Sequence, residues 1–101
     1  MEDMRWGEVR EALDGPLRRL VYVAYRGQHE FKRYQVHYEA LSGIIALGRL
    51  MPGRFDERWP DRKVPGETQR KLFTAITTVR PFIGRDYDAL ERLYARLLKP
   101  A

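Results

Sequence analysis

The stretch YVAYRGQHEFKRYQVHY (residues 22–38) decides the fold, because it is compatible with two different structures. As a β-hairpin it turns at RGQHE (26–30), and the residues from Tyr34 to Tyr38 alternate between apolar and polar, as in a half-buried strand. As two helices it breaks at Gly27, since glycine commonly follows the last residue of a helix. The choice determines whether its tyrosines and basic side chains gather on one surface or alternate across a sheet.

The spacing of apolar residues favours two helices. Apolar side chains recur along one helical face, and Pro16 can occupy a first helical position, where its missing N–H is tolerated. The residues on this face are Leu17, Leu20, Ala24, Phe31, Tyr34, Tyr38, Leu41 and Ile45. No strand is indicated outside 19–50, and an isolated hairpin is marginally stable in water. We therefore predict helices over 16–26 and 29–50, with a three-stranded meander over 19–50 and flanking helices as the alternative.

Apolar periodicity in the rest of the chain predicts three more helices, over 3–13, 67–79 and 87–98. Asp3 and Asp86 can cap the first and the last of these. The sequence DGP (14–16) and Pro81 are typical of helix ends, because proline lacks the N–H that continues a helix. The residues expected to face the core are Trp6, Val9, Ala12, Leu13, Leu72, Phe73, Ile76, Val79, Leu90, Leu93, Tyr94 and Leu97.

The length of the chain fits one domain. A chain of 101 residues can build one hydrophobic core but is too short for a second. We therefore predict a single domain (1–101), folded as an all-α compact bundle of about five helices with a long Pro/Arg-rich loop at 51–66. The sequence has no cysteine and no run of ~18 apolar residues, the length that spans a membrane. We expect a cytoplasmic protein without disulfides or a membrane partner.

The composition also carries a bias in its polar residues. The chain has no asparagine, and its 15 arginines outnumber its 4 lysines. Scarce asparagine and abundant ion-pairing charge suit a thermophilic protein, although a GC-rich genome produces the same preference for arginine. The bias therefore leaves both explanations open.

The basic side chains are unevenly distributed along the chain. The formal net charge is +5, yet residues 1–14 hold two basic and five acidic side chains. Residues 15–38 hold five basic side chains and one acidic side chain. This asymmetry predicts either an anionic partner for the middle of the chain or ion pairs between the two segments.

Helical spacing gathers basic and aromatic residues of this middle segment into stripes. Arg18, Tyr22 and Arg26 follow one another at intervals of four residues, and so do Arg33 and His37. Arginine bonds phosphate and tyrosine stacks on bases, so the pattern predicts a nucleic-acid-binding face, with RNA favoured over DNA. The predicted face comprises Arg18, Arg19, Tyr22, Arg26, Lys32, Arg33 and His37. It suits a small non-enzymatic binding protein or an accessory subunit of a ribonucleoprotein.

The proline-rich loop offers a second candidate surface. Aromatic and arginine side chains alternate there, which is typical of residues that anchor a protein partner. The residues are Arg54, Phe55, Arg58, Trp59 and Arg62. The alternative function is therefore a protein interaction module or inhibitor, or a homo-oligomer, anchored through 54–63. The competing interpretation is that Phe55 and Trp59 fold back over the core.

The sequence supplies little for catalysis. Ser42 is the only serine, and His29 and His37 have no obvious third ligand for a metal, so we predict no cofactor and no metal site. RYQVH (33–37) is similar to the motif of HEPN ribonucleases, an arginine and a histidine separated by four to six residues, but only three residues intervene here. The resemblance covers these positions alone. It implies a remote alternative, a metal-independent ribonuclease with Arg33 on phosphate and His37 as base.

Overall fold

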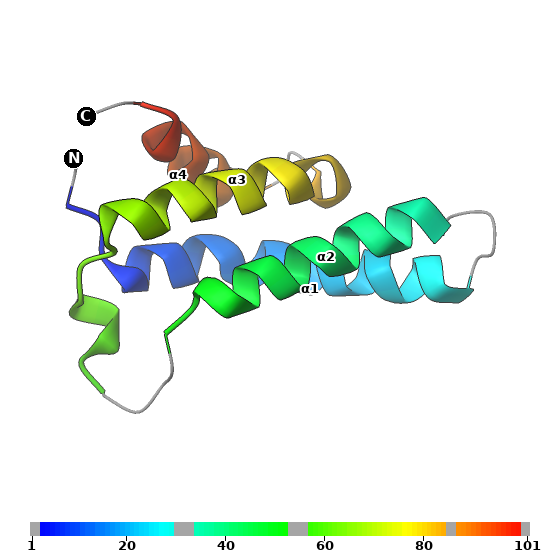
Figure 1. Cartoon of the computed structure of the whole chain (residues 1–101), viewed down its shortest axis with the longest axis horizontal. Coiled ribbons are helices and arrows are strands. Elements are labelled where there is room, and N and C mark those ends of the chain that lie inside the picture. The colour runs from blue at the N-terminus through cyan, green and yellow to red at the C-terminus, as the bar shows by residue number, and fades with distance from the viewer. Residues whose placement is uncertain (1–2, 30–33, 53–56, 85–86, 100–101) are drawn as a thin grey trace.

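The computed structural model describes residues 3–29, 34–52, 57–84 and 87–99, and for residues 25–29 and 34–38 it describes the backbone alone. Within these ranges the fold is helical (Figure 1), and its elements are α1 (Trp6–His29), α2 (Tyr34–Leu50), the 3-10 helix η2 (Trp59–Asp61), α3 (Gly66–Ile83) and α4 (Asp88–Leu98). The described residues contain no strand, only an isolated bridge between Arg5 and Lys63. The all-α prediction is therefore confirmed, and the three-stranded meander over 19–50 is wrong.

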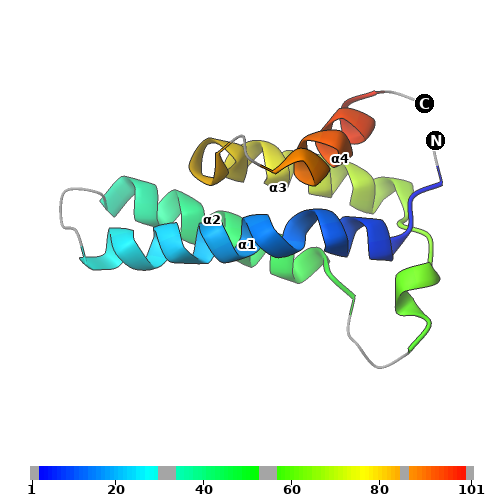
Figure 2. The same cartoon turned by 180° about the vertical axis from the view of Figure 1, so that it is seen from behind.

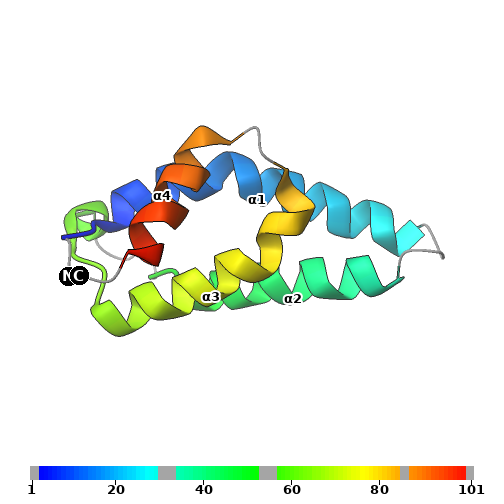
Figure 3. The ribbon, with the colours of Figure 1, turned by 90° about the horizontal axis from the view of Figure 1, so that it is seen from above.

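The helices form an elongated bundle. α1 and α2 lie side by side as a long antiparallel pair, with α3 packed across α2 (Figures 1 and 2). α4 lies along the first half of α1, as the view from above shows (Figure 3). The molecule measures 42 × 31 × 22 Å, and the start of α1 lies near the end of α4, where Glu8 pairs with Arg96.

The predicted count of five helices is wrong, because α1 is continuous where we expected two helices. It passes through Pro16, which is buried, and through Gly27 to His29. A proline inside a helix removes one hydrogen bond and crowds the carbonyl four residues earlier, at a cost of about 3 kcal/mol. Leu13 before the proline and Leu20 after it are both buried in the same core, so continuing the helix keeps both in place. Burial of this face offsets the cost of the proline.

The third predicted helix is also longer than expected. α3 includes Pro81, which we expected to end it, and continues to Ile83. Ile83 is buried, which favours one more turn. The helix ends at Gly84, whose φ of 94° lies in the region that glycine adopts most readily.

The core lies between the four helices. The predicted inward residues of 3–13 are buried, as are Leu72, Ile76 and Val79 of α3 and Leu90 and Leu93 of α4. Phe73, Tyr94 and Leu97 are half-buried at its edge.

The single apolar face predicted across 17–45 does not continue into α2. Leu41 and Ile45 are exposed, by 37% and 47%, while Ala40, Gly43 and Leu47 face inward. The positions that face the core shift between α1 and α2 because these are separate helices. The spacing of apolar residues in one helix does not fix the orientation of the other. Two large apolar side chains of α2, Leu41 and Ile45, are therefore exposed to solvent.

Candidate functional site

Three residues of the predicted nucleic-acid face lie together on the exposed side of α1. The Tyr22 side chain is 49% exposed, and the guanidinium carbon of Arg19 lies 5.7 Å from the centroid of its ring. Arg18 is one helical turn before Tyr22 and is also exposed. We call Arg18, Arg19 and Tyr22 the α1 platform. It combines two cations with an accessible aromatic ring.

The charge of the α1 platform is only partly neutralised. A nitrogen of Arg18 donates a hydrogen bond to the Asp14 carboxylate at 3.1 Å, one helical turn away. Both side chains are largely exposed, and such pairs contribute little stability and exchange readily with other partners. Phosphate can therefore compete with Asp14 for Arg18.

The other residues of the predicted face fall outside the part that the structure describes in full. Arg26 and His37 lie on α1 and α2, but their side chains are not described. Lys32 and Arg33 lie outside the described residues. The structure therefore places Arg18, Arg19 and Tyr22 together and leaves the rest of the face, including the Arg33 and His37 pair of the ribonuclease alternative, as predictions.

Trp59 of the proline-rich segment faces inward. Trp59 is 8% exposed and packs in the core, with the guanidinium carbon of Arg10 5.6 Å from its ring centroid. Its buried position argues against Trp59 as an anchor for a partner. Arg58 and Arg62 are exposed, whereas Arg54 and Phe55 lie outside the described residues.

Backbone and ionic contacts fix this segment to the start of α1. The Val64 N–H donates to the Met4 carbonyl at 2.7 Å, and the Trp6 N–H donates to the Arg62 carbonyl at 3.1 Å. Asp3 lies 3.3 Å from the Lys63 ammonium. These contacts make residues 59–64 part of the folded domain.

Acidic residues of the N-terminal segment form ion pairs with cations from distant parts of the chain. Besides Lys63, Asp3 lies 3.8 Å from Arg5, and Glu8 pairs with Arg96 of α4. Among these N-terminal acids, only Asp14 has a described contact with the α1 platform. Within the part of the two segments that the structure describes, the predicted pairing is seen between Asp14 and Arg18.

Arg80, in contrast, is a cation whose described contacts connect two helices of the fold. It forms two hydrogen bonds to the Glu91 carboxylate, of 3.2 and 2.7 Å, and its guanidinium carbon lies 3.9 Å from the Tyr94 ring centroid. The hydrogen bonds to Glu91 raise the pKa of Arg80 above its usual value, despite opposing desolvation. Tyr94 stacks in turn on Phe73, at 5.3 Å between ring centroids. This cluster joins α3 to α4.

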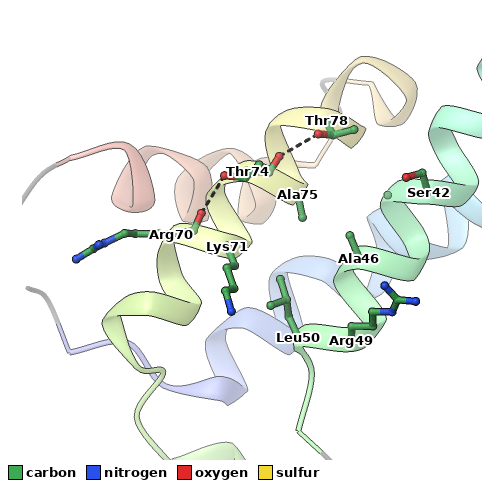
Figure 4. A pocket seen from close by; sticks show the side chains of 10 residues that line it. Ser42, Ala46, Arg49, Leu50, Arg70, Lys71, Thr74, Ala75 and Thr78 are labelled. Atoms are coloured by element: carbon green, nitrogen blue, oxygen red, sulfur yellow. Dashed lines mark hydrogen bonds between the residues drawn. The ribbon is translucent and has the colours of Figure 1, made fainter.

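Sequence reasoning missed a groove between α2 and α3, shown in Figure 4. It has a volume of about 490 Å³ and is lined by Ser42, Gly43, Ala46, Arg49, Leu50, Arg70, Lys71, Thr74, Ala75 and Thr78. The signal in the sequence was the small residues Gly43 and Ala46, one turn apart, facing Ala75. That signal needs the pairing of α2 with α3, which the sequence does not specify.

Neither a metal-binding cluster nor a membrane-spanning helix is found in the described part of the chain. No group of three His, Asp or Glu side chains there is placed to hold a metal ion. No helix there is long and apolar enough to cross a membrane.

Comparison with known proteins adds no relative: no family model, no curated protein and no solved structure matches this chain. The function must therefore be argued from the site itself.

Proposed function

We propose that this chain is a small non-enzymatic protein that binds single-stranded nucleic acid, with RNA favoured, through the α1 platform. The observation that carries the proposal is the half-exposed Tyr22 ring, which lies under the Arg19 guanidinium and one turn from Arg18. Single exposed aromatic rings are common on protein surfaces, so the cations beside the ring carry the argument. Here it is flanked by cations.

The chemistry of the platform suits an unpaired nucleotide. A base can stack on the exposed part of the Tyr22 ring, and one stacked base contributes about 1–3 kcal/mol in single-strand binding. The two guanidinium groups can bond the phosphates on either side of that base, since arginine makes bidentate, charge-assisted contacts with phosphate. Single-stranded regions of RNA expose such bases, whereas a duplex keeps them stacked.

The net charge of the chain supports the same partner. A formal charge of +5 attracts a polyanion and speeds its encounter with the protein. Ion pairs hold Arg80 and Arg96 within the fold, but the α1 platform is exposed and its described acidic contact is Asp14. The cations best placed to meet a phosphate backbone therefore include Arg18 and Arg19.

The test is fluorescence anisotropy with labelled single-stranded RNA, duplex RNA and single-stranded DNA. We expect single strands to bind more tightly than the duplex, and the triple variant Arg18→Gln, Arg19→Gln, Tyr22→Ala to lose most of the affinity. The matched control is Arg92→Gln, which removes an exposed arginine from α4 and should bind as the wild type does. Equal affinity of the triple variant and the wild type would contradict the proposal.

A protein partner is the second candidate, and the exposed apolar side of α2 favours it. Leu41 and Ile45 border a shallow hollow of about 300 Å³ that Ser42, Ala46 and Arg49 complete. A second copy of the chain can be tested by light scattering on the wild type and on Ile45→Glu. A larger mass that falls in the variant supports self-association, and a monomer mass for both argues against it.

A further inference from the structure

The two ends of the groove between α2 and α3 differ in how closely the helices approach one another. A Cβ atom placed on Gly43 would lie 2.0 Å from Cγ1 of Val79, so the two helices are in close contact there. Toward the other end, Lys71 and Leu50 point across the groove toward one another (Figure 4). The volume of about 490 Å³ lies within the range of small-molecule sites.

The floor of the groove is smooth and apolar. Gly43, Ala46 and Ala75 line it, and none of them has a side chain longer than one carbon. Short side chains leave a surface on which a flat ring can lie close to both helices.

The hydroxyl groups of Thr74 and Thr78 on α3 are placed to accept hydrogen bonds from a ligand. The Thr74 hydroxyl donates its proton to the Arg70 carbonyl at 3.2 Å, and the Thr78 hydroxyl donates to the Thr74 carbonyl at 3.1 Å. A hydroxyl has one proton and two lone pairs, so each oxygen keeps the capacity to accept. This side of the groove therefore favours a ligand that carries N–H groups.

The edges of the groove are cationic and poorly neutralised. Arg49 and Arg70 border the groove on α2 and α3, with side chains that extend outward on opposite sides (Figure 4), and neither has an ion-pair partner among the residues that the structure describes. Lys71 lies 3.6 Å from Glu67, but both side chains are mostly exposed, and such a pair is weak. These edges favour an anion.

We infer that the α2–α3 groove binds a nucleotide, with the base on the floor of small residues, its amino group at Thr74 and Thr78, and its phosphate at Lys71. A nucleotide unites the three features that the groove requires: a flat ring, hydrogen-bond donors and a phosphate. The α1 platform contributes no residue to the groove, so this inference does not rest on the proposed function. The nucleotide can be free or part of a strand.

The test is a titration of ¹⁵N-labelled protein, followed by NMR, with adenosine 5′-monophosphate. We expect the amide signals of Gly43, Ala46, Thr74 and Thr78 to shift. A short adenine oligonucleotide and inorganic phosphate are titrated separately. Shifts with both the mononucleotide and the oligonucleotide show that the groove accepts a nucleotide within a strand, and shifts with the mononucleotide alone assign it to free nucleotide. Either result supports the inference.

Three variants define the contacts. Ala46→Trp should abolish binding, because the indole fills the groove. Lys71→Gln should weaken binding of adenosine 5′-monophosphate by about tenfold, since a charge-assisted hydrogen bond is lost. Thr74→Val should weaken it by about fivefold but leave purine riboside 5′-monophosphate, which has no amino group, unaffected. Arg92→Gln serves as the control and should bind as the wild type does.

Several results would overturn the inference. One is the absence of shifts at the groove with both the mononucleotide and the oligonucleotide, and another is equal shifts with inorganic phosphate alone, which would indicate a nonspecific anion site. Unchanged binding of adenosine 5′-monophosphate by Lys71→Gln would also overturn the inference. This variant keeps the test decisive if Ala46→Trp does not fold. The triple variant of the α1 platform separates the two proposals, because it should still bind the mononucleotide.

Discussion

The segment around Trp59 and the α1 platform around Tyr22 have similar compositions but opposite structures. Each places an aromatic ring among arginines, and in each a guanidinium group lies over the ring, at 5.6 Å for Arg10 and Trp59 and at 5.7 Å for Arg19 and Tyr22. Trp59 is nevertheless 8% exposed, whereas Tyr22 is 49% exposed.

The difference shows that an arginine beside an aromatic ring can occur both in the core and on an exposed surface. Around Trp59 the ring fills the core, and backbone hydrogen bonds hold residues 62 and 64 to the start of α1. Around Tyr22 about half of the ring is exposed to solvent, and its described ring contact is with Arg19. Exposure of the ring, which composition does not reveal, separates the two cases.

The largest effect is expected from Trp59→Ala. Removing a buried tryptophan leaves a cavity, and we expect the free energy of unfolding to fall by about 3–5 kcal/mol. Urea denaturation followed by circular dichroism measures this loss. A variant as stable as the wild type would show that Trp59 is not part of the core, and would restore it as a candidate anchor for a partner.

The matching change on the other surface is Tyr22→Ala. We expect stability to fall by about 1 kcal/mol, because the half-exposed ring loses its contact with Arg19 and little buried surface. Affinity for single-stranded RNA should fall by about 1–3 kcal/mol, the usual contribution of one stacked base. Anisotropy and urea denaturation on the same variant measure both quantities. A loss of stability without a loss of affinity would assign Tyr22 to the fold.

The smallest effect on stability concerns the two arginines over the rings. Arg10→Gln and Arg19→Gln each remove one exposed cation–π contact, so each should lower stability by about 0.5 kcal/mol. Only Arg19→Gln should weaken RNA binding. Equal weakening in both variants would mean that total charge, and not the α1 platform, determines affinity.

Much of the fold could be predicted from apolar periodicity, and the errors have a common physical cause. Pro16 was expected at the boundary between two helices and Pro81 at the end of one, and both lie within helices. The local cost of a proline is fixed, but the benefit of continuing a helix depends on burial of the residues beyond it. Leu20 and Ile83 are buried only once the other helices pack, so local sequence could not predict these continuations.

The candidate site was predictable where one helix forms it. The α1 platform follows from spacing on a single helix, so Arg18 and Tyr22 were found together. The groove requires Gly43 of α2 to meet Val79 of α3, a contact between segments far apart in the sequence. The burial of Trp59 likewise depends on its packing against α1.

The most direct test of the central claim is the salt dependence of RNA binding by the wild type and by a variant with Arg18→Gln and Arg19→Gln. Each phosphate contact with a single strand contributes about 0.7 to the slope of log K against log salt, because bound counterions are released. We predict a slope that is shallower in the variant by about 0.7 for each arginine removed. Identical slopes would contradict the assignment of the α1 platform to phosphate binding.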